Sequence, residues 1–83
     1  MTLPTVSVAC IQMTTTNDMD ANIREVERLV RSAAAQGAEL IATPENCFYM
    51  RAFDTDNVPL FPMETHIGLL HCQALARELG VWI

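Results

Sequence analysis

The fold of this chain is decided by residues 38–48, which are Ala38-Glu39-Leu40-Ile41-Ala42-Thr43-Pro44-Glu45-Asn46-Cys47-Phe48. The apolar run 40–43 predicts a short buried strand. Pro44 ends this run, because proline has no backbone N–H to donate within a sheet. Glu45 follows at once, so the sequence predicts a carboxylate at the carboxyl end of a strand.

A second apolar run and a helix precede this strand. Residues 6–13 carry no charge and are rich in β-branched side chains, which predicts a strand covered on both faces. The polar residues 14–18 offer N-cap chemistry, with Asn17 followed three positions later by Asp20. From about residue 18 to Gln36 the apolar positions recur at helical spacing. Helical spacing also lets the outer face form the pairs Glu25–Arg28 and Glu27–Arg31, and Gly37 supplies a left-handed terminator.

Strand, helix and strand in this order predict a right-handed crossover with two parallel strands. A second helix is expected over about 64–79, closed by Gly80, and residues 81–83 resemble the start of a third parallel strand. The expected fold class is therefore α/β, a βαβαβ parallel-sheet fragment. Residues 46–63 form a long connection at the carboxyl edge of the sheet, where loops of open α/β sheets shape ligand sites.

Glu45 is the strongest candidate for chemistry, because a proline fixes the backbone one residue earlier. Position alone leaves two interpretations open, a catalytic acid or base and a solvated carboxylate. Phe48 and Tyr49 follow closely and are candidates to line a substrate pocket, although packing under the loop explains them equally well.

The segment 38–48, with its apolar strand and Pro44-Glu45 pair, resembles nitrilase-superfamily carbon–nitrogen hydrolases. Further matching features are Gln12-Met13 after the first strand, Asn22 early in the first helix, and the approaches 33–38 and 74–81 to the next two strands. The resemblance implies that residues 1–83 are the N-terminal part of one domain truncated at its C-terminus. It also implies a complete fold that is an α-β-β-α sandwich.

In that family a Glu, a Lys and a Cys cleave non-peptide carbon–nitrogen bonds of small amides or nitriles, without a cofactor. The resemblance assigns the general base to Glu45, and the chain contains no Lys to fill the second role. The fragment alone is therefore expected to be inactive and to need the missing C-terminal portion. Cys47 is a poor nucleophile candidate, since no His or Lys stands nearby to activate its thiol.

Composition argues against several other classes. Ten acidic residues against five arginines give a net charge of −5, and no basic cluster suits nucleic acid or an anionic membrane. Three Cys without a CxxC pair and two isolated His predict neither a disulfide framework nor a metal site. The chain is expected to be cytoplasmic, and its uncovered sheet predicts instability or self-association, including a homo-oligomer.

Two alternatives to a hydrolase fragment remain open from the sequence. One is a small α/β binding or interaction module in which Glu45 is only a carboxylate at the ligand edge. A nucleotide-binding module is disfavoured, because residues 14–16 are threonines where a glycine-rich loop would follow the first strand. The other alternative is an inert remnant that never folds alone.

Overall fold

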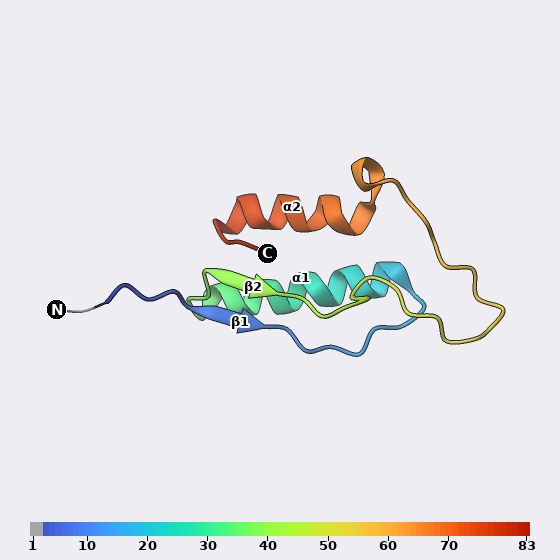
Figure 1. Cartoon of the computed structure of the whole chain (residues 1–83), viewed down its shortest axis with the longest axis horizontal. Coiled ribbons are helices and arrows are strands. Elements are labelled where there is room, and N and C mark those ends of the chain that lie inside the picture. Colours follow the sequence, from blue (N-terminus) through green and yellow to red (C-terminus); the bar gives the residue numbers. More distant parts are fainter. Residues whose placement is uncertain (1–2) are drawn as a thin grey trace.

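The computed structural model describes residues 3–83 as two short strands and two helices joined by a long loop (Figure 1). Strand β1 spans Val8–Cys10, helix α1 Met19–Ala35, strand β2 Leu40–Ala42 and helix α2 Ile67–Leu79. A 3₁₀ turn, η1, occupies Met63–Thr65 just before α2. This order confirms the predicted α/β class.

The sheet is parallel, as the crossover geometry predicted. Val8 pairs with Leu40 and Cys10 with Ala42, and the Ile11 amide donates to the Ala42 carbonyl at 2.9 Å. On the other side of β2, Trp82 forms a single parallel bridge with Leu40. The expected third strand is thus present as one bridge rather than as a full strand.

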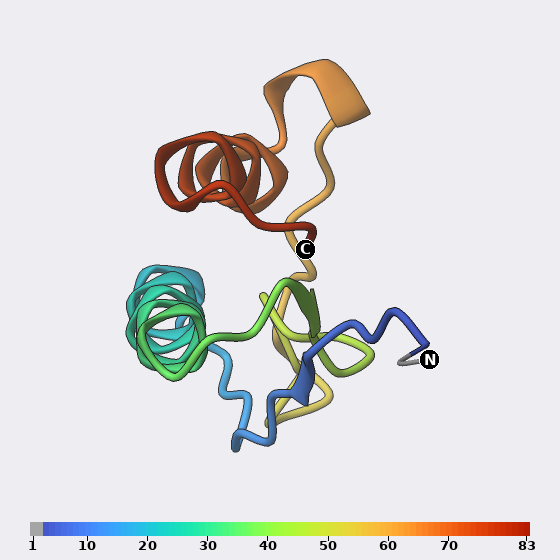
Figure 2. The same cartoon turned by 90° about the vertical axis from the view of Figure 1, so that its left-hand side faces the viewer.

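Within residues 3–83 the sheet is covered on one face only. The first strand is also shorter than predicted, because β1 takes up only three of the residues 6–13. Both helices lie on the same side of the sheet (Figure 2). On the opposite side the exposed fractions are 54% for Val8, 41% for Leu40 and 78% for Trp82. An apolar run without alternation predicts two covered faces, but among residues 3–83 no element lies over this second face.

Helix α1 begins one residue later than expected and ends within one residue of the predicted boundary. Its N-cap is Asp18, whose side chain accepts a hydrogen bond from the Ala21 amide at 3.1 Å. The cap satisfies a donor that the first helical turn leaves without a partner. After the helix, Gly37 has a φ of 97°, which confirms the predicted left-handed terminator.

Helix α2 begins at Ile67 rather than near Glu64. The imidazole Nδ1 of His66 accepts from the amides of Gly68 and Leu69 at 3.1 and 3.3 Å, so His66 is the N-cap. Residues 63–65, which the apolar spacing had placed in the helix, form the 3₁₀ turn instead. The helix ends at Gly80 in the left-handed conformation, as predicted.

A small core joins the helices to the sheet. Its buried apolar residues are Ile11, Val26, Val30, Ile41, Cys47, Cys72 and Leu75. On the surface above it, Arg31 bridges the two helices by pairing with Glu27 of α1 and Glu78 of α2, and His71 contacts Glu27. The pairs Glu25–Arg28 and Glu27–Arg31 were predicted from helical spacing, whereas the contacts between helices were not.

Candidate functional site

Glu45 lies where the sequence places it, three residues after the end of β2 and at the carboxyl edge of the parallel pair. Pro44 precedes it, and the chain turns at residues 45–46. Its carboxylate is exposed and makes no ion pair with any of residues 3–83. The backbone thus presents this carboxylate outward from the end of the sheet.

The backbone adopts an unusual conformation one residue after Glu45. Asn46 has a φ of 56°, in the left-handed region. Asparagine tolerates this region better than most residues, because its short polar side chain can bond to the local backbone. Asn46 therefore redirects the chain immediately after Glu45.

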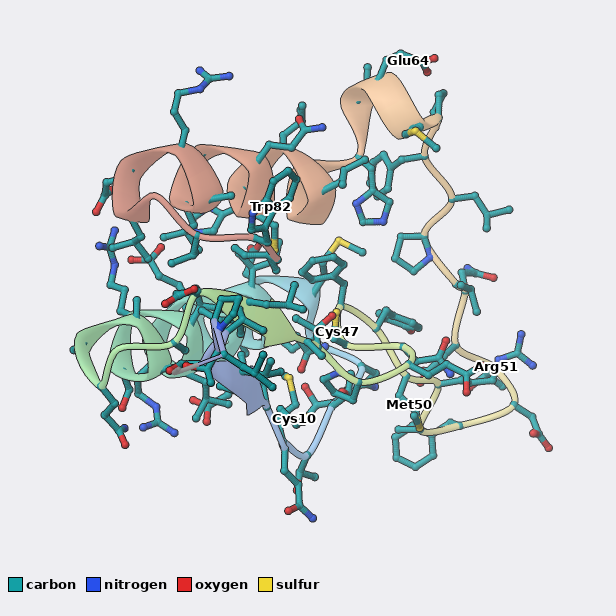
Figure 3. The ribbon with its side chains drawn as sticks, turned by 60° about the vertical axis from the view of Figure 1, so that its left-hand side comes forward. Cys10, Cys47, Met50, Arg51, Glu64 and Trp82 are labelled. Atoms are coloured by element: carbon teal, nitrogen blue, oxygen red, sulfur yellow. The ribbon has the colours of Figure 1, made fainter. Side chains whose placement is uncertain are left out.

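Cys47 and Phe48 anchor the chain beyond the turn. Cys47 is buried in the core, with 8% of its surface exposed, and lies at the start of the loop that follows β2 (Figure 3). The Phe48 ring packs against the N-terminus of α2, where a Cβ added at Gly68 would come within 2.7 Å of the ring. The rings of Phe48 and His66 also lie 5.5 Å apart between centroids.

Asn22 of α1 ties this loop to the loop that follows β1. Its side chain is 2% exposed and makes hydrogen bonds with both its amide nitrogen and its oxygen. The nitrogen donates to the carbonyls of Thr16 and Phe48 at 2.7 and 2.8 Å, while Oδ1 accepts from the Thr16 amide at 2.9 Å. The sequence had marked Asn22 as a matching feature without indicating this role.

Phe48 and Tyr49, the residues predicted to line a substrate pocket, are both half-buried. Phe48 packs against the core and α2, so most of its contacts are structural. A role for either ring at a substrate stays a prediction. Glu45, Phe48 and Tyr49 lie on one short segment after β2.

A hollow with a volume of about 370 Å³ lies elsewhere in the molecule. It runs between β1 and the C-terminal half of α1, and its lining includes Ser7, Cys10, Ser32 and Gln36. Glu45 is not part of this lining. The hollow therefore belongs to the β1 edge of the sheet rather than to the carboxyl edge.

The long loop after the site is folded locally around Asp56. Its carboxylate accepts from the amides of Ala52 and Phe53 and from the side chain of Asn17. These hydrogen bonds, the backbone ones first, lower the pKa of Asp56. Met50 and Arg51 lie farther along the same loop than Cys47 (Figure 3), and Arg51 is exposed.

Comparison with known proteins gives the chain its family. The sequence profile of the family described as carbon-nitrogen hydrolase matches residues 7–83. The chain belongs to this family. Its first strand, its helix α1, the Pro44-Glu45 pair and α2 all lie within the matched range.

Curated relatives include the N-carbamoylputrescine amidases of Solanum lycopersicum, Arabidopsis thaliana and Solanum tuberosum. Each is 34% identical over 82 residues, which cover 94% of this chain and 27% of the relative. The chain therefore spans about a quarter of the length of these relatives. No solved structure matches the chain significantly.

Two further observations concern residues 3–83. No cluster of three or more His, Cys, Asp or Glu side chains is arranged to hold a metal ion there. Neither helix of this region has both the length and the apolar character needed to cross a bilayer.

Proposed function

We propose that this chain supplies the general base, Glu45, of a nitrilase-type amidohydrolase that cleaves a non-peptide carbon–nitrogen bond in a small amide. The observation that carries the proposal is an exposed carboxylate on a backbone pinned at both sides, at the carboxyl edge of the sheet in a member of the carbon–nitrogen hydrolase family. A general base must reach the group whose proton it accepts while its own backbone stays still.

The proposed chemistry follows a Glu-Lys-Cys mechanism. The Glu45 carboxylate accepts the proton of a cysteine thiol, and the thiolate attacks the amide carbonyl carbon to form a carbon–sulfur bond. Glu45 passes this proton to the nitrogen as the carbon–nitrogen bond breaks, and ammonia or an amine leaves. Water then hydrolyses the resulting thioester, or the thiocarbamate that a carbamoyl substrate gives, and the cysteine regains its proton. A lysine stabilises the negative charge of the tetrahedral intermediate. This chain has no lysine, so that residue comes from outside residues 1–83.

The relatives favour an amide over a nitrile as the substrate class. They are named as amidases of N-carbamoylputrescine, a small molecule with a carbamoyl group. We propose a small carbamoyl or carboxamide compound for this chain as well. A nitrile is the second candidate for the substrate. The cytoplasmic location and the self-association that the sequence led us to expect both stay predictions.

The uncovered face of the sheet supports a need for further chain. Val8, Leu40 and Trp82 expose apolar surface on one face, opposite both helices. Exposing apolar surface of this kind to water is unfavourable, and burying it stabilises a protein. We propose that the remainder of the domain covers this face and that the 83 residues alone have no hydrolase activity.

The test is a chimera in which this chain replaces the matching quarter of the Solanum lycopersicum amidase. Hydrolysis of N-carbamoylputrescine is measured for the chimera, its Glu45→Gln variant and a matched Glu39→Gln variant. Glu39 is an exposed carboxylate at the start of β2, at the opposite end of the strand. The amide keeps the shape and removes the proton acceptor, so activity should fall at least about 1000-fold for Glu45→Gln and should persist for Glu39→Gln.

Two outcomes would contradict the proposal. Wild-type turnover by Glu45→Gln would remove Glu45 from the mechanism. Loss of thioester formation in a folded Cys47→Ser chimera would mean that the nucleophile lies within this chain, since we place the buried Cys47 outside the chemistry.

A further inference from the structure

We propose that Asn22 is the positioning residue of the Glu45 base, acting through the hydrogen bond from its side-chain amide to the Phe48 carbonyl. The inference rests on the proposed role of Glu45 and adds a residue on a different element, helix α1. Asn22 does not touch the substrate in this scheme. It holds the short segment on which Glu45 stands.

Every hydrogen-bonding group of the Asn22 side chain is used. Its two N–H groups donate to the carbonyls of Thr16 and Phe48, and its oxygen accepts from the amide and the hydroxyl of Thr16 at 2.9 and 3.2 Å. Asn22 is buried and cannot bond to water, so these hydrogen bonds replace the ones that its side chain would make with water in the unfolded chain. The arrangement therefore requires an amide, with a donor and an acceptor in fixed places.

The Asn22 amide joins two loops rather than stabilising one. Thr16 belongs to the loop between β1 and α1, and Phe48 belongs to the loop after β2. The Thr16 carbonyl accepts a further hydrogen bond from the Met50 amide at 3.0 Å. The Met50 bond fastens residues 48–50 directly to the loop after β1, and the Phe48 bond fastens them to it through Asn22 of α1.

Glu45 lies between two fixed points. Ala42 is held in β2 by its carbonyl, which accepts from Ile11, and Phe48 is held by Asn22. Between these points Pro44 restricts its own φ, and Asn46 adopts the left-handed conformation. If the Phe48 carbonyl is released, one of the anchors downstream of Glu45 is lost and the Glu45 carboxylate can shift. Displacement of a catalytic group by about 1 Å can cost about 100-fold in rate.

The test uses Asn22→Asp in the chimera defined above. Aspartate has the same shape, but in its ionised form it places an acceptor against the Phe48 and Thr16 carbonyls where Asn22 places donors. The matched control is Asn17→Ala. Asn17 also donates from its side-chain amide across the same two loops, to Asp56, but it is exposed and bonds farther from Glu45.

The measurement is kcat and KM for N-carbamoylputrescine at about 15 °C, with the melting temperature of each variant recorded alongside. A positioning role predicts that Asn22→Asp lowers kcat about 10- to 100-fold with KM changed less than about threefold, and that Asn17→Ala leaves both constants near wild type. A residue that only stabilises the fold would lower the melting temperature and leave kcat of the folded enzyme unchanged.

Asn22→Ser provides a second variant that keeps a small buried hydroxyl but is too short to span to Phe48. Wild-type kcat in either folded Asn22 variant would overturn the positioning role. Glu45→Gln measured in parallel separates the two proposals. If Glu45→Gln is inactive and the Asn22 variants are fully active, only the positioning role fails. If Glu45→Gln is active, the base assignment fails first.

Discussion

Gly68 is the position at which a single methyl group should disturb both stability and the candidate site. It is buried at the start of α2, and an added Cβ would lie 2.7 Å from Cγ and Cδ2 of Phe48 and 2.8 Å from Cδ1. These atoms belong to the part of the ring nearest its attachment, so a rotation of the ring tip does not relieve the contact. Phe48 must move, and with it the segment that carries Glu45.

Two opposing terms set the size of the effect of Gly68→Ala. Alanine favours a helix over glycine by up to about 1 kcal/mol, and by less here because Gly68 is the second residue of α2. Forcing a methyl group into a filled site costs about 1–3 kcal/mol. The cost of overpacking exceeds the gain in helix propensity, so the net loss of folding free energy should be about 1–2 kcal/mol.

Thermal denaturation of the chimera measures this loss as a fall of several degrees in melting temperature. Phe48→Leu makes room for the methyl group, so the double variant Gly68→Ala/Phe48→Leu should be more stable than the sum of the two single changes. The close packing of Phe48 on α2 would be contradicted if Gly68→Ala had a higher melting temperature than wild type. It would also be contradicted if the stability losses of Gly68→Ala and Phe48→Leu simply added in the double variant.

Two further predictions concern the helices. His66→Ala removes the N-cap of α2 and should lower the folding stability by about 1 kcal/mol. His66→Asn retains an acceptor and should lower it less. Equal losses of stability in a melting experiment would contradict the capping role. Hydrogen bonds from Arg31 lower the pKa of Glu27 and of Glu78 below the ordinary 4.5, so their stabilising contribution is complete above that pH and is lost as the pH falls below it. The fall in melting temperature between about pH 6 and about pH 3.5 should therefore be smaller for Arg31→Ala than for wild type, and an unchanged fall would place the acid sensitivity elsewhere.

Local patterns in the sequence predict the regular elements well. The left-handed glycines at the ends of α1 and α2, the parallel pairing of residues 8–10 with 40–42 and the pairs on the outer face of α1 all follow from short-range rules. The start of α2 was wrong by three residues, because apolar spacing does not reveal that a histidine can cap a helix. The length of the first strand was wrong, since β1 is shorter than the apolar run 6–13. Cover on both faces of the sheet stays a prediction, because an apolar run shows that a strand needs cover while the cover comes from elements far away in the chain.

At the candidate site, too, features that depend on neighbouring residues could be predicted and features that depend on distant residues could not. Glu45 was found from its neighbours in sequence, because a strand, a proline and a carboxylate stand side by side. The hydrogen bond from Asn22 to Phe48 could not be found in this way, since Phe48 is 26 residues away and accepts through its backbone carbonyl. A backbone acceptor leaves no mark on the type of residue that provides it. Only the three-dimensional placement of the two loops reveals the connection.

The separation of Glu45 from Cys47 has a physical cause that bears on the mechanism. Alternate residues of an extended strand point to the same face, so an uninterrupted strand would set these two side chains together. Asn46 interrupts it with a φ of 56°, which leaves Glu45 exposed and turns Cys47 into the core with Cys72 and Leu75. Burial there, with Cys47 nearby, raises the pKa of Cys72 to about 11, as expected where a thiolate is poorly solvated. Cys47 lies in the same surroundings, turned into the core and away from the exposed Glu45, so we place it outside the proposed reaction.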